Sequence, residues 1–210
     1  MLLSKGRLVT IEGVDASGKT TQIKYLKKFF KDTNKIIFTR EPGGSPVGDK
    51  IRDILCKGKQ DNMLPLTELL LFNASRLEHY DKLIKPKLEE GYIVICDRFI
   101  DSTYVYQYFA GNIAYPIFEG LNNLVLGNVK PDLTIVLDID TDLAAKRHEE
   151  RDTDEDRFEK LPKEYHRLVR KGYLEIAVAN PGRVKILNAD TDSEGLHQQI
   201  LKILNKEFEF

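Results

Sequence analysis

The part of this sequence that most constrains the fold is a glycine-containing loop near the N-terminus, set between an apolar run and a helical pattern. Leu8, Val9 and Ile11 predict a short buried strand, and residues 13–20 (GVDASGKT) match the pattern G-x-x-x-x-G-K-[ST]. Residues 23–30 then place apolar side chains at the spacing of one helical face. Strand, loop and helix therefore follow one another in the order that a phosphate-binding loop requires.

The residue types of this loop suit a grip on phosphate groups. Gly13 and Gly18 allow backbone angles that a side chain would forbid, so consecutive N–H groups can point into one concavity at a helix N-terminus. Lys19 would neutralise the β and γ phosphates of a nucleotide, and the Thr20 hydroxyl would hold Mg²⁺. Glycine-rich turns also occur without a ligand, but the whole pattern with both flanks is far more specific. The residues predicted to bind the nucleotide are Gly13, Val14, Asp15, Ala16, Ser17, Gly18, Lys19, Thr20 and Thr21.

The composition of the chain favours a single globular domain and argues against a nucleic-acid-binding, membrane or secreted protein. A chain of 210 residues with 41% hydrophobic content is long enough for one sizeable core, and its alternating strand and helix patterns predict a single α/β domain over residues 1–210. A net charge of −1 gives no overall attraction to nucleic acid or to an acidic membrane. No apolar run is long enough to span a bilayer, and the N-terminus lacks the apolar core of a signal peptide. Cys56 and Cys96 are far apart and form no C-x-x-C motif, so neither a disulfide framework nor a zinc site is indicated. We therefore expect a cytoplasmic protein that binds neither nucleic acid nor membrane.

Two further apolar runs deliver polar residues to the edge of the predicted sheet that carries the glycine loop. Residues 36–39 (IIFT) end at Arg40, Glu41 and Pro42, and residues 92–96 (YIVIC) end at Asp97 and Arg98. Ligands of open α/β sheets bind at the carboxyl ends of the strands. Asp97 is thus a candidate for holding Mg²⁺, and Arg98 for clamping a phosphate. A solvated turn after residue 39 and a helix-capping role for Asp97 also fit the pattern.

A helical pattern that begins near Pro65 places Phe72 and Arg76 four residues apart, so both project from one face. The pattern alone favours a Phe in the core and an Arg at the surface, with a stacking surface beside a cationic clamp as the alternative. A second predicted helix, after Arg98, carries polar residues that could face the same cleft. These are Ser102, Thr103, Tyr106 and Gln107.

The segment from Arg147 to Glu164 changes composition abruptly, because it contains almost no apolar residues and several charges of each sign. Such a run is usually a solvated surface, but in a P-loop enzyme it can close over the nucleotide and bring arginines to the transferring group. Arg151 and Arg157 are the candidates for that role. Residues 116–126, in contrast, are rich in apolar side chains and predict a helix that is buried or faces another subunit.

Taken together, these motifs resemble thymidylate kinase, the family that phosphorylates dTMP with ATP. The likeness runs nearly end to end, through IEGVDASGKTTQ, TREPGG, LLLFNASR, CDRFIDSTYVYQ, PDLTIVLDI and DRFE followed by YLEIA. The first motif alone indicates only a P-loop fold, whereas TREPGG together with DRF and the F-x-x-x-R pair is far more specific. The resemblance implies the three-layer α/β fold of the P-loop kinases, with a five-stranded parallel sheet flanked by helices. It also implies ATP and Mg²⁺ as co-substrate and cofactor, a role in dTTP biosynthesis, and a homodimer.

For the acceptor, the resemblance implies that Phe72 stacks on thymine, that Arg76 contacts the base or its phosphate, and that Arg98 binds the dTMP phosphate. Asp15 matches the acidic position near the sugar 3′-hydroxyl, and Tyr106 matches an aromatic residue under the deoxyribose. The implied dTMP-binding residues are Asp15, Arg40, Glu41, Pro42, Phe72, Arg76, Arg98, Ser102, Thr103, Tyr106 and Gln107.

The family has two arginine arrangements, one with an Arg in the phosphate loop and one with an Arg in the lid. Here the loop interior, residues 14–17, has no arginine, while the charged lid segment of residues 147–164 contains Arg151 and Arg157. The chain therefore resembles the bacterial arrangement with a lid arginine. The catalytic residues that follow are Lys19, Arg98, Arg151 and Arg157, and the predicted metal-binding residues are Thr20 and Asp97.

Two other functions stay open at this point. Another small-acceptor P-loop kinase, acting on a different nucleotide, a nucleoside or a metabolite, would carry the same loop, although Phe72 and Tyr106 favour a pyrimidine deoxynucleotide. A regulatory nucleotide-binding protein without catalysis is the second alternative. A GTPase of that kind would need an N-K-x-D-type motif downstream, and the sequence contains none.

Overall fold

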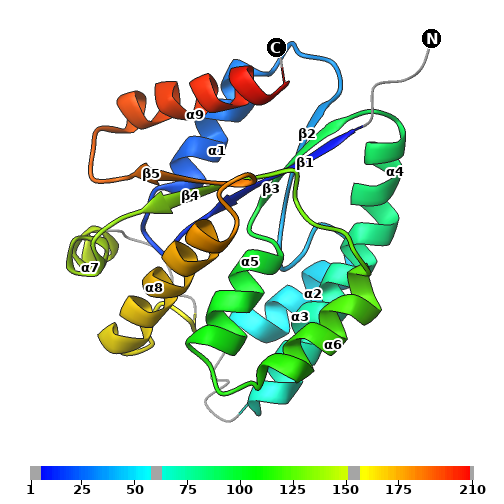
Figure 1. Ribbon diagram of the computed structural model, residues 1–210, viewed down its shortest axis with the longest axis vertical. Helices are drawn as coiled ribbons and strands as arrows, with labels where there is room; N and C mark the ends of the chain where they lie inside the picture. The colour runs from blue at the N-terminus through cyan, green and yellow to red at the C-terminus, as the bar shows by residue number, and fades with distance from the viewer. Residues whose placement is uncertain (1–5, 58–62, 151–156, 209–210) are drawn as a thin grey trace.

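The structure, a computed structural model, describes residues 6–57, 63–150 and 157–208. Its strands form one sheet in the order β2-β3-β1-β4-β5, in which each neighbouring pair runs parallel (Figure 1). The strands are β1 (Arg7–Glu12), β2 (Ile36–Arg40), β3 (Ile93–Asp97), β4 (Leu133–Asp138) and β5 (Val184–Asn188). The predicted five-stranded parallel sheet is confirmed, and β1, β2 and β3 each begin and end within one residue of the predicted run.

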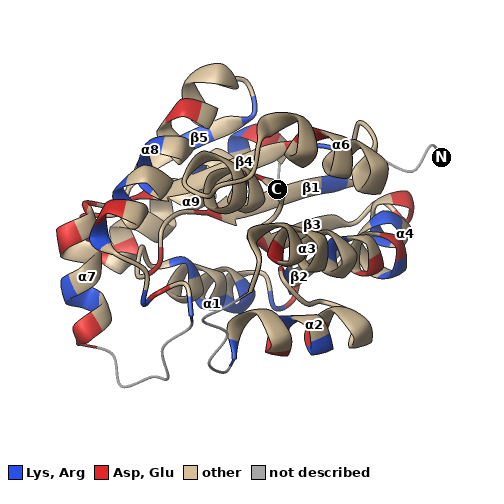
Figure 2. Cartoon of the chain, turned by 90° about the horizontal axis from the view of Figure 1, so that it is seen from below, with Lys and Arg blue, Asp and Glu red and all other residues tan. Residues whose placement is uncertain are grey.

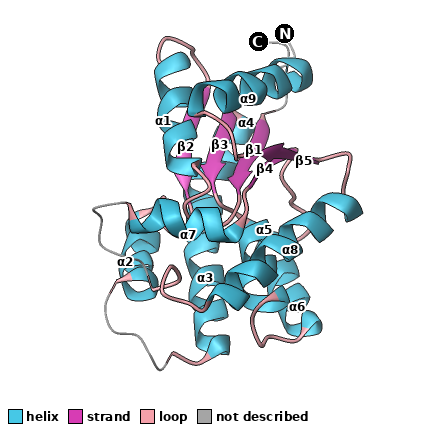
Figure 3. Cartoon of the chain, turned by 90° about the vertical axis from the view of Figure 1, so that its left-hand side faces the viewer, coloured by secondary structure: helices cyan, strands magenta, loops and turns pink. Residues whose placement is uncertain are grey.

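Helices cover both faces of this sheet, which explains why its strands are apolar on both sides. In β1, Leu8, Val9 and Ile11 are all at most 1% exposed. The helices nearest the sheet are α1 (Lys19–Phe29), α4 (Lys85–Glu89), α5 (Ile100–Thr103), α8 (Lys163–Ala179) and α9 (Ser193–Phe208). Figures 1 and 3 show α1 and α9 packed together on one face and α4, α5 and α8 on the other. The three-layer α/β fold expected from the sequence is therefore confirmed.

The strand order places a point where the connections diverge next to the glycine loop. The chain leaves β1 toward α1 on one face and leaves the neighbouring β3 toward α5 on the opposite face (Figure 3). In an open α/β sheet, ligands bind where connections diverge in this way at the carboxyl ends of adjacent strands. The register pairs Ile11 with Asp97, so the glycine loop and the Asp97–Arg98 step leave the sheet at the same level.

A second group of helices extends beyond the sheet on the β3 side. It consists of α2 (Pro46–Cys56), α3 (Pro65–His79) and α6 (Tyr115–Leu126), and α3 packs against both of the others (Figure 1). Two π-helical segments, η1 (Tyr80–Ile84) and η2 (Tyr104–Phe109), continue α3 and α5. Because π-helical turns often occur at functional sites, the position of Tyr106 and Gln107 within η2 is notable.

The charged segment predicted as a lid is partly helical. Residues 147–149 form the end of α7 (Thr141–Glu149), and residues 163–164 begin α8. Residues 157–160 form a turn, whereas Arg151 and its neighbours through residue 156 lie outside the described residues. Helix α7 therefore ends, and helix α8 begins, inside the predicted lid segment.

Charged side chains of both signs are interspersed along α2, α4 and α7 (Figure 2). This distribution agrees with the net charge of −1 and gives these helices no basic face. Among the helices that the structure describes, none is both long and apolar enough to cross a membrane.

Candidate functional site

The glycine loop has the backbone geometry of a phosphate cradle. Gly13 has a φ of 142°, and a Cβ at this position would lie 2.5 Å from the carbonyl oxygen of Leu137, so only glycine fits. Gly18 has a φ of 96° and precedes α1, which starts without a side-chain cap. The first N–H groups of α1 are therefore left for a ligand, and the positive end of the helix dipole faces the same place.

Lys19 is folded back against the loop. Its ammonium group donates to the carbonyl oxygens of Gly13 at 2.9 Å and Val14 at 2.7 Å. Burial, assisted by the positive charge of Arg98, lowers the pKa of Lys19 to about 8. A nucleotide phosphate would replace these neutral carbonyls with anionic oxygens and would favour the charged ammonium.

Arg98 lies directly against the loop, in a backbone conformation that is rare for a residue with a side chain. Its φ is 65°. Its guanidinium donates to the carbonyl oxygen of Gly13 at 3.1 Å and to the hydroxyl of Ser102 at 3.2 Å, and it forms an ion pair with Asp15. Strained backbone of this kind persists where the surroundings hold it, often at functional sites. The structure thus brings residues 13–15 together with residues 98–102, which lie more than 80 positions further along the chain.

Asp15 and Tyr106 complete the side of the site next to Arg98. The Tyr106 hydroxyl donates to Asp15 at 3.1 Å, and the Arg98 guanidinium lies 5.2 Å from the centre of the Tyr106 ring. Burial opposes ionisation of Asp15, but the charges of Arg98 and Lys19 outweigh it and hold the pKa of Asp15 below its usual value. An ionised carboxylate is therefore available here as a hydrogen-bond acceptor.

Glu12 is a member of this cluster that sequence reasoning missed. It is fully buried at the end of β1 and accepts hydrogen bonds from the Phe99 N–H at 2.7 Å, the Ser102 hydroxyl at 2.6 Å and the Tyr173 hydroxyl at 2.9 Å. Burial and the negative charge of Asp101 raise the pKa of Glu12 to about 7. A carboxylate inside an apolar strand, one residue before Gly13, was the signal that could have revealed it.

Arg76 forms a second cluster and corrects one expectation. The helical pattern alone favoured a surface Arg, but the side chain is only 2% exposed. Its Nε donates to Glu41 Oε2 at 2.8 Å and its Nη2 to the Thr103 hydroxyl at 2.8 Å. The remaining nitrogen, Nη1, is buried without a hydrogen-bond partner. Because a buried unpaired donor is costly, Nη1 is suited to binding an acceptor atom of a ligand.

Phe72 and Gln107 lie at the outer part of the same region. The Phe72 ring packs against Phe158 with ring centres 5.8 Å apart, and Phe158 also meets the edge of Tyr106 at 6.0 Å. The Gln107 amide donates to Glu68 at 2.9 Å. Phe158 therefore connects the Phe72 side of the site to the Arg98 side.

Arg157 is held by the same outer region and not by the phosphate loop. It forms an ion pair with Glu68 and donates to the carbonyl oxygen of Leu55 at 3.2 Å. Its guanidinium also lies 4.4 Å from the centre of the Phe158 ring. The other predicted lid arginine, Arg151, lies outside the described residues.

The residues predicted for the end of β2 separate into exposed and buried members. Arg40 is exposed, whereas Glu41 and Pro42 are buried. The Pro42 carbonyl accepts a hydrogen bond from Arg52 at 3.0 Å, so this proline shapes the turn. Of the three, Glu41 makes the direct contact with another predicted site residue, Arg76.

The predicted metal-binding residues fit Mg²⁺ held together with a nucleotide. Asp97 Oδ1 is buried without a hydrogen-bond partner, and Thr20 is exposed in the first turn of α1. Within the described part of the chain, no group of three or more His, Cys, Asp or Glu residues could hold a metal ion. Mg²⁺ commonly takes one or two protein oxygens and completes its shell with phosphates and water, so this small donor set is compatible with the ion.

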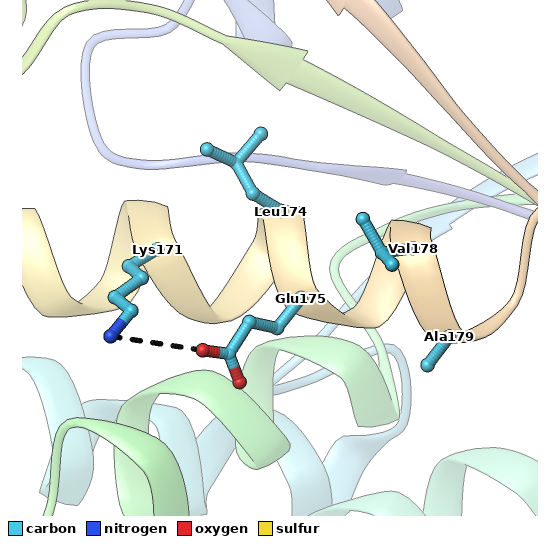
Figure 4. Close-up of a pocket in the computed structure, with 5 residues that line it drawn as sticks. All are labelled: Lys171, Leu174, Glu175, Val178 and Ala179. Atoms are coloured by element: carbon cyan, nitrogen blue, oxygen red, sulfur yellow. Dashed lines mark ion pairs between the residues drawn. The ribbon is translucent and has the colours of Figure 1, made fainter.

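A shallow hollow of about 370 Å³ lies elsewhere, along the surface of α8 (Figure 4). Its lining comes from successive turns of that helix, namely Lys171, Leu174, Glu175, Val178 and Ala179. Lys171 and Glu175 form an ion pair at 3.8 Å across its rim. None of these residues belongs to the predicted nucleotide site, so the hollow is a separate surface feature.

Comparison with known proteins identifies the family of this chain. The family model described as thymidylate kinase matches residues 11–200. The chain belongs to the thymidylate kinase family. It is 41% identical to a thymidylate kinase of Symbiobacterium thermophilum, covering 94% of this chain and 92% of that one, and 41% identical to one of a Sulfurihydrogenibium strain, covering 96% and 98%.

The fold agrees as well. The crystal structure of the Ehrlichia chaffeensis thymidylate kinase superposes with a TM-score of 0.77 at 35% identity, covering 95% of this chain and 98% of that one. The protein is thus a thymidylate kinase, an ATP-using transferase of nucleotide biosynthesis that phosphorylates dTMP.

Proposed function

We propose that the phosphates of ATP and dTMP meet at Arg98. The observation that carries this proposal is the contact between Arg98 and the glycine loop, through the Gly13 carbonyl and Asp15. A dTMP phosphate bound by Arg98 would then lie beside a γ phosphate held by the loop amides and Lys19. In-line transfer to an oxygen of the acceptor phosphate needs no strong base, because that oxygen is already anionic. Alignment and fixed positive charge supply the catalysis.

The acceptor nucleoside occupies the region between the two clusters in this proposal. Arg76 offers Nη1, its one nitrogen without a partner, to an acceptor atom of the base or phosphate. Phe72 provides the aromatic face for thymine, and Asp15 with Tyr106 borders the sugar. Ser102, Thr103 and Gln107 lie around these groups and are already hydrogen-bonded to Arg98, Arg76 and Glu68, respectively.

Asp97 and Thr20 are the residues we assign to Mg²⁺. The unpaired Oδ1 of Asp97 supports this assignment. The bound ion would offset negative charge on the β and γ phosphates. The protein's part is to keep the Asp97 carboxylate at the end of β3, where Asp97 pairs in register with Ile11 of β1, the strand that leads into the glycine loop.

Replacement of Lys19 by Ala tests the mechanism. Turnover should fall by about a thousandfold or more, because the positive charge that stabilises the transferring phosphoryl group is lost. Lys24→Ala, on the exposed side of the same helix, is the matched control and should keep normal activity. Near-normal turnover in Lys19→Ala would contradict the proposed mechanism.

Acceptor selectivity is tested by ADP release with a panel of nucleoside monophosphates. We expect dTMP to be the preferred acceptor, with dUMP next, since Phe72 can stack on either pyrimidine. Equal rates with purine nucleotides would contradict the proposed placement of the base.

We also propose that a lid arginine, Arg151 or Arg157, stabilises the transferring group, since the loop interior of residues 14–17 has no arginine. Such an arginine typically contributes about a thousandfold or more to turnover. Arg151→Ala and Arg157→Ala are compared with Arg167→Ala, whose side chain is 53% exposed. Normal turnover in both lid variants would contradict the lid-arginine arrangement.

We also propose that the protein forms a homodimer whose interface consists of α2, α3 and α6. Exposed apolar side chains recur at helical spacing on α3, where Leu66, Leu70 and Leu77 are 45%, 47% and 49% exposed. They continue on the neighbouring helices at Val47, Ile54, Ile117 and Leu124. A continuous apolar face of this kind typically marks a protein interface.

The dimer is tested by light scattering after gel filtration. Leu70→Asp should convert the dimer to a monomer, because the charge would be buried at the interface without a partner. Val178→Asp, at a residue that is 81% exposed on α8, is the control and should remain dimeric. A native protein that elutes as a monomer would overturn this part of the proposal. The cytoplasmic location remains a prediction from the sequence.

A further inference from the structure

We propose that His79 is a positioning residue for Arg76, acting through Glu41, and that it sets the affinity of the enzyme for dTMP. The inference rests on the proposed acceptor role of Arg76. It concerns a side chain that lies at the end of α3, behind the site, and that would not itself touch the substrate.

His79 is completely buried and uses both of its ring nitrogens. Nδ1 lies 3.1 Å from Glu41 Oε1, and Nε2 lies 2.6 Å from the Thr39 hydroxyl. The other oxygen of Glu41 accepts from Arg76 Nε at 2.8 Å. A continuous series of hydrogen bonds therefore runs from β2 through His79 and Glu41 to Arg76.

The chemistry of Glu41 fixes the direction of the bond that it makes with His79. An ionised carboxylate can only accept, so the proton lies on Nδ1 of His79 and is donated to Glu41. The Thr39 hydroxyl can both donate and accept, so it pairs with Nε2 whichever of the two atoms carries the hydrogen. Both oxygens of Glu41 are thus occupied, which prevents the carboxylate from rotating away from Arg76.

The consequence for Arg76 is a single available orientation. Glu41 holds Nε and Thr103 holds Nη2, so only Nη1 has no partner. A guanidinium held at two points loses little conformational entropy when a ligand binds to the third. Removing His79 from this arrangement would loosen Glu41 and with it the direction of Nη1.

The turn after β2 is shaped around the His79 ring. A Cβ on Gly44 would lie 2.4 Å from the ring, and the neighbouring Gly43 N–H donates to the hydroxyl of Ser75 on α3 at 3.0 Å. The ring and the turn therefore fit each other closely. This fit gives His79 a fixed position from which it can orient Glu41.

Two substitutions separate the bonds made by the two ring nitrogens. The amide of Asn reaches about as far as Nδ1, and the amide of Gln about as far as Nε2. His79→Asn can therefore keep the donor to Glu41, whereas His79→Gln loses it. We expect His79→Gln to raise the KM for dTMP by about tenfold, because the variant loses a hydrogen bond to a charged group. The KM for ATP should stay unchanged, and kcat should be nearly unchanged. His79→Asn should stay within about threefold of the native KM for dTMP.

Two reference variants make the result unambiguous. Glu78→Gln, the preceding residue on α3, should leave both KM values unchanged. Arg76→Gln should raise the KM for dTMP on its own, and His79→Gln should add little to it, because both changes remove the same orientation. If Arg76→Gln has no effect, the proposed role of Arg76 fails. If Arg76→Gln acts but His79→Gln does not, only the positioning role fails.

A purely structural role for His79 predicts a different pattern. His79→Gln and His79→Asn would then alter both KM values and kcat in proportion to their loss of stability in urea, and this result would overturn the proposal. Should His79→Gln fail to fold, Glu41→Gln tests the same link, and an unchanged KM for dTMP in that variant would overturn it.

Discussion

Replacing Glu12 with Gln should remove a pH dependence of stability that the native carboxyl imposes. Burial raises the pKa of Glu12 from the usual 4.5 to about 7. The folded protein therefore keeps a proton that the unfolded chain releases, so the free energy of unfolding falls as the pH rises from 4.5 to about 7. The difference of about 2.5 pH units, at about 1.4 kcal/mol for each, corresponds to about 3–4 kcal/mol.

Urea unfolding of the native protein and Glu12→Gln, from about pH 5 to about pH 8, provides the assay. The Gln side chain keeps an oxygen for the Phe99 N–H, and its amide can donate to the hydroxyls of Ser102 and Tyr173. Most other titrating groups are common to both proteins and cancel in the difference. From the lower to the higher pH, the free energy of unfolding of the variant should rise by about 2–3 kcal/mol relative to that of the native protein. A difference that does not change with pH would refute the reasoning.

Three further substitutions test separate features. Gly13→Ala should abolish ATP binding in a titration and lower stability by about 1–3 kcal/mol, because its Cβ would lie 2.5 Å from the Leu137 carbonyl oxygen. Asp101→Asn should lower the free energy of unfolding in urea by about 3 kcal/mol, since it breaks the two-point ion pair with Arg183 at 2.7 Å and 2.8 Å. Phe72→Ala should raise the KM for dTMP by about tenfold and leave that for ATP unchanged, as measured by ADP release; equal changes in both would contradict a stacking role.

The local sequence determined the sheet and its ligand edge. The apolar runs that became β1 and β3 are long enough to form buried strands, and the residue that follows each run is placed by the strand itself. Gly13 and Arg98 could therefore be assigned to one edge of the sheet without any knowledge of distant contacts. Glycine at positions 13 and 18 is likewise a local requirement, since it depends on backbone angles at those residues.

Side-chain partners were less predictable. Helical spacing alone favoured a surface position for Arg76, but Glu41 and Thr103 surround it in the folded chain. The spacing of a single helix shows which residues share a face, and it does not show what packs against that face. The resemblance to thymidylate kinase did suggest a ligand role for Arg76, but the Glu41 pairing itself came from the structure.

The side-chain contacts that only the tertiary structure revealed join residues that are far apart in the sequence. Tyr173 reaches Glu12 across 161 residues, and His79 reaches Glu41 across 38. Neither pairing leaves a periodic trace in the sequence, because each requires α8 or α3 to pack at one particular angle against the sheet. The sequence by itself determined the succession of strands and helices along the chain, the phosphate loop and the resemblance to the family. Folding decided which buried acids and bases face one another, since that depends on packing between elements that are distant in the chain.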